Sequence, residues 1–205
     1  MAQQGTAKER ICDALLDLME ERPFEEIPVT EITRQAGVSR TIFYRYFDSV
    51  YDVLQKIEDD YLEGLPTEGD AVDVLSETSR PSGADGPFRT TDYAQYIADH
   101  LHMYRVLIGP NGEPSFESRL HNRIYRISLQ TIRLRIGENR PEAEPMAEYL
   151  ASALNGAIRW WAMHEDEVDT ESMSLLLSSI SSNATRAVIE CDQRLGIDIR
   201  RRGQE

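Results

Sequence analysis

Residues 29–52, VTEITRQAGVSRTIFYRYFDSVYD, decide how the N-terminal part of the chain folds. Their apolar spacing indicates two short helices, one from about Thr30 to Ala36 and one from Arg40 to Tyr46. Gly37 tolerates the left-handed backbone that ends a helix, and Ser39 can cap the second helix. Two short helices joined by so tight a turn predict a helix-turn-helix, in which the first helix braces the second.

The motif divides into an apolar and a polar set of side chains. The apolar set, expected to close a small shared core, is Ile32, Ala36, Val38, Ile42 and Phe47. The set expected to face outward from the second helix is Arg40, Thr41, Tyr44, Arg45 and Tyr46. These donors and aromatic hydroxyls suit phosphates and base edges in a DNA major groove.

The N-terminal quarter of the chain, about residues 7–55, strongly resembles the tetracycline-repressor (TetR) family. The shared features are an amphipathic first helix, an aromatic residue after its end (Phe24), and most of the run T-x-x-x-I-x-x-x-A-G-V-S-x-x-x-x-F-Y-x-Y-F. Thr30 and Ile32 stand closer together here than in that run. A Gly-Val-Ser turn followed by Phe-Tyr-Arg-Tyr-Phe is far more restrictive than a generic helix-turn-helix pattern.

The resemblance implies an all-α protein with a three-helix, DNA-binding helix-turn-helix domain over residues 1–50. A helical ligand-binding and dimerisation domain would follow over residues 51–205. The implied function is that of a transcriptional regulator, most often a repressor. It would bind a roughly palindromic double-stranded operator as a homodimer, with recognition helices in successive major grooves. A small-molecule inducer in the C-terminal domain would release it.

The resemblance also assigns roles to single residues by position. Those that would contact phosphate are Thr30, Tyr44 and Tyr46. Those that would lie in or beside the major groove are Arg40, Thr41 and Arg45. Ser39 is open between helix cap and phosphate donor, while Phe43 and Phe47 are expected in the core.

One position departs from the family pattern. Family members usually place a lysine at the start of the fourth helix, where it holds the DNA backbone, but this chain has Val50, with Asp48 two residues before it. Losing one phosphate contact predicts weaker binding and a salt dependence flatter by about one unit of slope.

The charge of the chain is strongly acidic, at −14 overall. It is unevenly placed, since residues 1–47 carry 6 basic and 8 acidic side chains and the remainder carries 16 and 28. Three arginines and no acid lie between Thr33 and Phe47, so DNA binding is permitted there. The acidity and Val50 together motivate an alternative: a TetR-like protein-interaction module or co-activator that has lost operator binding. A purely structural helical hairpin is disfavoured, because an outward Tyr-Arg-Tyr would make a poor core.

Outside the motif, apolar spacing predicts helix nearly everywhere. The predicted helices cover about residues 11–19, 49–62, 90–108, 115–136, 141–165 and 170–194. Residues 64–89, rich in Gly, Pro, Ser and acid, are predicted to form a loop or linker. The sequence Gly-Pro-Asn-Gly at 109–112 is a strong turn signal.

The last two predicted helices are the natural dimerisation pair. One face of the first carries Met146, Leu150, Ala153, Ala157, Trp160 and Trp161. The interface side chains proposed from both helices are Ala153, Ala157, Trp161, Met173, Leu176, Leu177, Ile180, Ala184 and Val188. The same faces could serve only the core of the monomer, or both roles could hold.

A ligand pocket is predicted between the helices that begin near residues 93 and 115. Its candidate side chains are Tyr96, His100, Met103, Tyr104, Phe116, His121, Tyr125, Trp160 and Trp161. For each of them, core packing or surface exposure is the commoner role. A basic run follows at Arg119, Arg123, Arg126, Arg133 and Arg135. It fits either an anionic inducer or, as we favour, a solvated face paired with acids of neighbouring helices.

Several classes of function are not expected. His100 and His102 are two residues apart and point to different sides of a helix, so no metal site is predicted. We find no Gly-rich phosphate loop and no nucleophile beside a base, which argues against an enzyme or a cofactor. No stretch approaches the roughly 20 apolar residues of a membrane helix, and the N-terminus lacks the apolar core of a signal peptide. A cytoplasmic protein is therefore expected.

Overall fold

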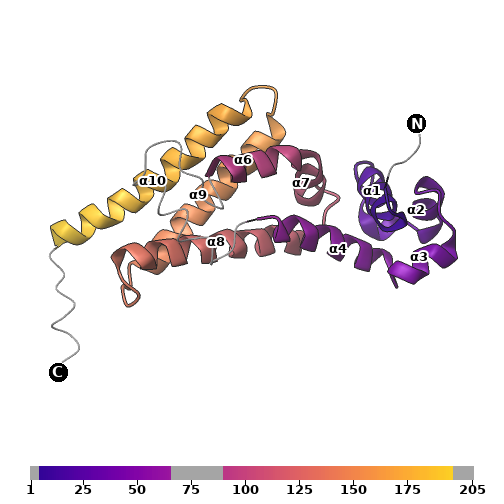
Figure 1. Ribbon diagram of the computed structural model, residues 1–205, viewed down its shortest axis with the longest axis horizontal. Helices are drawn as coiled ribbons and strands as arrows, with labels where there is room; N and C mark the ends of the chain where they lie inside the picture. The colour runs from indigo at the N-terminus through magenta and orange to yellow at the C-terminus, as the bar shows by residue number, and fades with distance from the viewer. Residues whose placement is uncertain (1–4, 66–89, 196–205) are drawn as a thin grey trace. The chain divides into compact units, whose positions relative to one another are not determined.

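The computed structural model describes residues 5–65 and 90–195, and all regular structure in these ranges is helical (Figure 1). The elements are α1 (Ala7–Met19), the 3-10 helix η1 (Phe24–Glu26), α2 (Val29–Gln35), α3 (Arg40–Tyr46), α4 (Val50–Glu63), α6 (Thr90–Asp99), α7 (Leu101–Ile108), α8 (Pro114–Ile136), α9 (Ala143–Met163) and α10 (Thr170–Leu195). The all-α fold class is therefore confirmed. Most of the loop predicted over residues 64–89 lies outside the described residues.

Reciprocal capping boxes begin two of the N-terminal helices. At α1, the Thr6 hydroxyl accepts a hydrogen bond from the N–H of Glu9 at 3.2 Å, and the Glu9 carboxylate accepts one from the N–H of Thr6 at 2.8 Å. At α4, Ser49 and Asp52 form the same arrangement. Each box satisfies backbone N–H groups that have no partner within the helix, so these helix starts are fixed locally by sequence.

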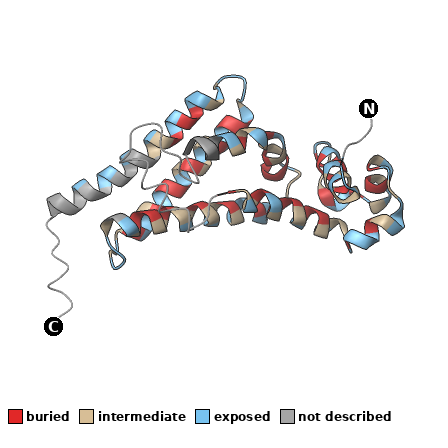
Figure 2. Cartoon of the chain, in the orientation of Figure 1, coloured by how far each residue is buried: buried red, intermediate tan, exposed pale blue. Residues whose placement is uncertain are grey.

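Helices α1 to α4, which we call the headpiece, share one apolar core. Its most deeply buried side chains include Ile11, Leu15, Ile32, Phe43 and Leu54, each at most 1% exposed. These residues come from all four helices, and Figure 2 shows buried positions in each of them. Burial of these side chains, at roughly 1.5–3 kcal/mol each, is what holds such short helices together.

Contacts group the described residues into two compact units. The N-terminal unit joins residues 5–65 with residues 96–120, and the C-terminal unit joins residues 90–95 with residues 121–195. The headpiece thus shares a unit with α7 and the first part of α8. In the described ranges, no helix is long and apolar enough to cross a membrane.

The single helix predicted over residues 90–108 is wrong, because the structure breaks it at His100 into α6 and α7. The Nδ1 atom of the His100 ring lies 2.8 Å from the carbonyl oxygen of Tyr96. That carbonyl also accepts the N–H of His100, at 3.2 Å. The His100 N–H is shared with the carbonyl oxygen of Ile97, also at 3.2 Å, and the spacing of apolar residues does not reveal this break.

The buried side of α9 in the C-terminal unit overlaps only in part with the apolar face identified from the sequence. The buried residues of α9 are Ala143, Ala147, Leu150, Ala151, Leu154, Ile158, Trp161 and Ala162. Trp160, expected on the same face as Trp161, is 45% exposed, whereas Trp161 is 2% exposed. Adjacent residues of a helix are separated by about 100°, so the two indoles cannot share one narrow face.

A partly buried ion pair joins α4 to α8 within the N-terminal unit. Arg119 donates a hydrogen bond to Glu58 at 2.6 Å and also pairs with Asp59. Glu58 is only 4% exposed, and its Oε1 has no hydrogen-bond partner. Burial raises the pKa of Glu58 to about 7, although Arg119 opposes that shift.

Two arginines of the basic run support the interpretation that the run is a solvated face paired with acids of neighbouring helices. Arg119 pairs with two acids of α4, and Arg133 pairs with Glu144 of α9 at 3.4 Å. Both use acids of another helix, as that interpretation expects.

The Glu58 carboxyl makes the stability of the folded chain depend on pH. Between its ordinary pKa of 4.5 and about 7, the unfolded chain loses a proton that the folded chain keeps, so stability falls as pH rises. The change from this group is on the order of 3 kcal/mol. We expect Glu58→Gln to remove this part of the decline, as measured by urea unfolding at pH 5 and pH 8.

The matched control is Glu63→Gln, which alters an exposed carboxyl of the same helix. In this variant the free energy of unfolding should change between pH 5 and pH 8 by the same amount as in the natural chain. An unchanged pH dependence in Glu58→Gln would contradict the raised pKa.

Candidate nucleic-acid interface

The turn between α2 and α3 has the geometry that the sequence predicts. Gly37 adopts a φ of 62°, in the left-handed region that favours glycine. The Ser39 hydroxyl accepts a hydrogen bond from the N–H of Ile42 at 3.2 Å. The predicted helix cap at Ser39 is confirmed, and the residue is exposed to solvent.

Two phenylalanines fix the inner side of α3. Phe43 is fully buried and Phe47 is 5% exposed, with their ring centroids 6.0 Å apart. The prediction that both belong to the core is confirmed. Of the other predicted core residues, Ile32 and Ala36 are buried, while Val38 and Ile42 are half-buried at the edge.

The outer side of α3 is polar and open to solvent. Tyr44 is 55% exposed and Tyr46 is 45% exposed. The other predicted DNA-contacting residues are exposed too: Thr30, Ser39, Arg40, Thr41 and Arg45. Figure 2 shows α3 coloured mostly as exposed. Arg34 of α2 is exposed as well, so three exposed guanidinium groups lie within residues 34–45.

Side chains that the sequence did not single out brace this surface from α1. Arg10 donates from Nε to the carbonyl oxygen of Ala36 at 3.0 Å, next to the turn. Gln35 donates to Asp17 at 3.0 Å, and Lys8 lies 5.9 Å from the centre of the Phe47 ring. These partners are 18 to 39 residues apart, so no local pattern could have indicated them.

The start of α4 has no cation. Val50 is half-buried, and Asp48 before it is exposed. The Asp52 carboxylate accepts the N–H groups of Asp48 and Ser49 at 3.0 and 3.1 Å. The N–H groups just before α4 are therefore bonded to an acid of the helix itself.

The predicted ligand residues separate into two groups. Four of them surround Tyr61 in the N-terminal unit, with ring centroids 5.7 to 6.3 Å from its own: Tyr96, His100, Tyr104 and Phe116. Tyr61, Tyr104 and Phe116 are at most 2% exposed, whereas Tyr96, His100 and Met103 are half-buried. Tyr96 donates from its hydroxyl to the carbonyl oxygen of Tyr61 at 2.8 Å, and burial raises its pKa.

The other four lie in the C-terminal unit, where each makes contacts of its own. His121 lies 3.3 Å from the amide nitrogen of Asn155 and 3.1 Å from a Glu148 carboxylate oxygen. Trp161 donates to the carbonyl oxygen of Val168 at 2.8 Å, and Trp160 stacks on His164 with ring centroids 4.4 Å apart. Tyr125 packs at the edge of a small cluster around Ile132.

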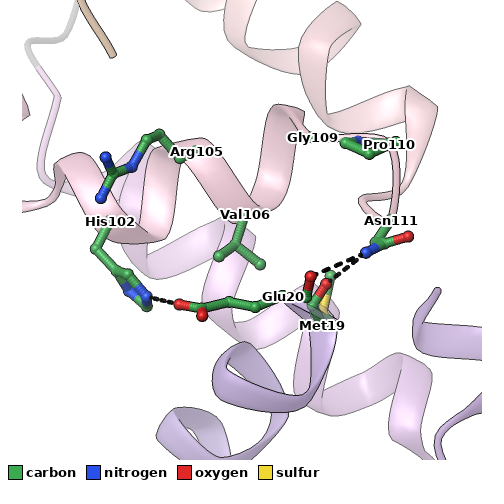
Figure 3. Close-up of a pocket in the computed structure, with 8 residues that line it drawn as sticks. All are labelled: Met19, Glu20, His102, Arg105, Val106, Gly109, Pro110 and Asn111. Carbon is green, nitrogen blue, oxygen red and sulfur yellow. Dashed lines mark hydrogen bonds and ion pairs between the residues drawn. The ribbon is translucent and has the colours of Figure 1, made fainter. Parts of the chain in front are cut away.

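An open pocket of about 310 Å³ lies in the N-terminal unit (Figure 3). Its lining residues are Met19, Glu20, His102, Arg105, Val106, Gly109, Pro110 and Asn111. None of the predicted ligand residues lines it. It lies between the end of α1 and α7.

Two family models match the chain. The model described as "Bacterial regulatory proteins, tetR family" matches residues 11–57, and the one described as "Transcriptional regulator C-terminal region" matches residues 89–183. The first contains the whole helix-turn-helix, and the second begins one residue before α6 and ends within α10.

Solved structures share the fold at low sequence identity. The dihydroxyacetone kinase operon activator DhaS has a TM-score of 0.60 at 19% identity, over 90% of this chain and 96% of that one. A TetR-family regulator from Streptomyces coelicolor has a TM-score of 0.57 at 18% identity, over 95% and 89%. A TetR-like regulator from Rhodococcus sp. RHA1 has a TM-score of 0.55 at 17% identity, over 88% and 96%. No curated protein sequence matches the chain.

Proposed function

Because the chain belongs to the TetR family of transcriptional regulators, we propose that it is a repressor that binds a palindromic operator as a homodimer. A small organic ligand held by the C-terminal helices releases it. Residues 1–50 form the DNA-binding domain in this proposal, and residues 51–205 form the ligand-binding and dimerisation domain.

The observation that carries the proposal is the two-sided character of α3. Its inner side is held by buried Phe43 and Phe47, so its outer side can be presented in one fixed orientation. Arg40 and Arg45 on that outer side suit guanine edges and phosphates, and the Tyr44 hydroxyl suits a phosphate oxygen. Tyr46 and Thr30 are proposed as further phosphate contacts, with Thr41 beside the groove.

Exposed apolar side chains on α9 and α10 support the homodimer. On α9, Tyr149, Trp160 and Met163 are 45% to 66% exposed, and they recur at the spacing of one helix face. On α10, Leu175 and Leu176 are 65% and 47% exposed. Large apolar side chains left exposed on two packed helices are typical of an association site, and a second copy of the same chain can cover them symmetrically.

The side chains proposed for the interface differ in how far their own chain covers them. Trp161, Met173 and Leu177 are at most 2% exposed, so they already pack inside their own chain. Ala153, Ala157 and Ile180 are half-buried, and Leu176 is exposed. The side chains of Ala184 and Val188 lie outside the described set. We therefore expect Leu176, with Ala153 and Ala157, to lie nearest the partner.

Tyr96, His100 and Met103 are the best placed of the proposed ligand contacts in the N-terminal unit. All three are half-buried, so a ligand could reach them, while Tyr104 and Phe116 are fully packed around Tyr61. In the C-terminal unit, His121, Tyr125 and Trp160 retain exposed surface. An amphipathic ligand with an aromatic or acyl body and one polar group would match the three half-buried side chains of the N-terminal unit.

A second candidate function is a TetR-like interaction module or co-activator without operator binding. Val50 at the start of α4, exposed Asp48 and the net charge of −14 favour it. One protein of this fold is itself described as an operon activator. The exposed arginines and tyrosines of α3 favour the repressor, because an interaction module has no need of them.

The first test is operator binding by the full-length protein. Duplexes selected from a random pool, and DNA from upstream of the gene, are titrated by fluorescence anisotropy with unrelated competitor DNA. We expect saturable binding that resists competitor, and we expect Arg45→Ala to weaken it about 10- to 100-fold through a lost base or phosphate contact. Arg126→Ala on exposed α8 surface is the charge-matched control and should leave the affinity unchanged. Selection that enriches no sequence would favour the interaction module.

Restoring a cation at the start of α4 should strengthen DNA binding. Val50→Lys adds one phosphate contact, so the slope of log K against log salt concentration should become steeper by about 0.9. Gln55→Lys makes a similar charge change at an exposed site more than one turn further along α4. Equal effects of the two substitutions would mean that only net charge matters, and that position 50 does not face the phosphate backbone of the DNA.

Dimerisation is tested by placing a charge on the proposed interface. Leu176→Glu should raise the dimer dissociation constant by on the order of a hundredfold, because twofold symmetry buries the charge twice. Leu134→Glu is the control, since Leu134 of α8 is 43% exposed. Sedimentation equilibrium gives both constants. A dimer that survives Leu176→Glu but not Leu134→Glu would place the interface on α8 instead.

A further inference from the structure

The C-terminal end of α1 is electrostatically unfavourable when considered by itself. The helix ends at Met19 with Glu20 as its C-cap, and its last turn contains no basic residue. Asp17, Glu20 and Glu21 place three carboxyl groups near this end. The last carbonyl groups of a helix lack partners within it, and its C-terminus carries partial negative charge. This end therefore needs hydrogen-bond donors from elsewhere in the chain.

The donors come from α7 and from the turn that follows it. Asn111 donates from Nδ2 to the carbonyl oxygen of Met19 at 2.9 Å, and the same nitrogen lies 3.4 Å from the carbonyl oxygen of Glu20. His102 pairs through Nε2 with the Glu20 carboxylate. Figure 3 shows the two contacts on either side of the pocket, with Val106 between them. The end of α1 is thus capped by Asn111, 92 positions after Met19, and its C-cap side chain is paired with His102, 82 positions after Glu20.

The turn that presents Asn111 has little freedom. The N–H of Gly112 bonds to the carbonyl oxygen of Gly109 at 3.1 Å, and a Cβ atom at Gly112 would lie 2.0 Å from the carbonyl oxygen of Leu107. Only glycine fits there, because the turn passes directly against the backbone of α7. The turn leads into α8 two residues later, at Pro114. Asn111 is therefore held by backbone geometry rather than by a flexible loop.

At its other end, α1 holds the helix-turn-helix. Arg10 bonds to the carbonyl oxygen of Ala36, one residue before the turn at Gly37, and Ile11 and Leu15 lie in the headpiece core. A helix of 13 residues spans about 20 Å. Movement of the end of α1 therefore reaches α3 through one stiff element.

We propose that Asn111 and His102 are positioning residues for DNA binding. They anchor the end of α1 to α7 and to the turn before α8, and so fix the direction in which each headpiece presents α3 to the operator. This inference rests on the proposed function. Loss of the anchor leaves the contacts of a single half-site intact, but it relaxes the preferred distance between the two half-sites.

The test replaces Asn111 with a side chain of the same shape that cannot donate. Asn111→Asp places a carboxylate against two carbonyl oxygens, and Asn111→Ala removes the donor without adding charge. Each variant is titrated with the selected operator, with a single half-site, and with operators whose half-sites are one base pair closer or further apart. Asn122→Asp, on exposed surface of α8, is the control for charge.

We expect Asn111→Asp to bind the full operator about 5- to 30-fold more weakly than the natural chain. Half-site affinity should change less than twofold, and the altered spacings should be tolerated nearly as well as the selected one. A role confined to stability would instead lower half-site and full-site binding together. Equal spacing preference in Asn111→Asp and the natural chain would overturn the proposal.

Amide hydrogen exchange separates this inference from the function on which it rests. Exchange in the last turn of α1 should rise about 5- to 30-fold in both Asn111 variants and stay unchanged in Asn122→Asp. Unchanged exchange in the Asn111 variants overturns the anchor whatever the DNA results. Faster exchange in a protein that selects no duplex would uphold the anchor and overturn its role in operator binding.

Discussion

Burial of Phe43 is the interaction on which the rest of the DNA-binding surface depends. Helix α3 has only seven residues, and an isolated helix of that length is not stable in water. Its side chains keep a fixed orientation because Phe43 is fully buried in the headpiece core, with Phe47 packed beside it. The Ser39 cap and the Gly37 turn then set where the helix begins. Every exposed arginine and tyrosine of α3 takes its direction from this arrangement.

The headpiece was largely predictable because its signals are local. Ser39, Gly37 and the alternation of Phe43 and Phe47 with Tyr44 and Tyr46 act within one or two turns of the chain. The break at His100 is not visible in the sequence, because the apolar spacing of Ile97, Leu101 and Tyr104 continues through it. The braces from Arg10 to Ala36 and from Asn111 to Met19 join residues 26 and 92 positions apart. Only the folded chain brings such partners together.

Several cations of the described residues outside α3 pair with acids of other segments. Arg119 and Arg133 pair with acids of α4 and α9, and Arg22 pairs with Glu31 in the headpiece. The arginines of α2 and α3 lie on a segment without acids and are exposed. A protein with a net charge of −14 can thus present a locally positive surface, since salt screens the field of distant charges within about 10 Å.

Trp160 and Trp161 lie next to each other in sequence but in opposite surroundings. Trp161 is buried, with its N–H bonded to the carbonyl oxygen of Val168, while Trp160 is 45% exposed and stacks on His164. The chain contains no other tryptophan. Its intrinsic fluorescence therefore combines one shielded emitter, which reports on the integrity of the α9 core, with one solvent-facing emitter open to collisional quenchers. Quenching of Trp160 fluorescence therefore reports directly on any molecule that covers the outer face of α9.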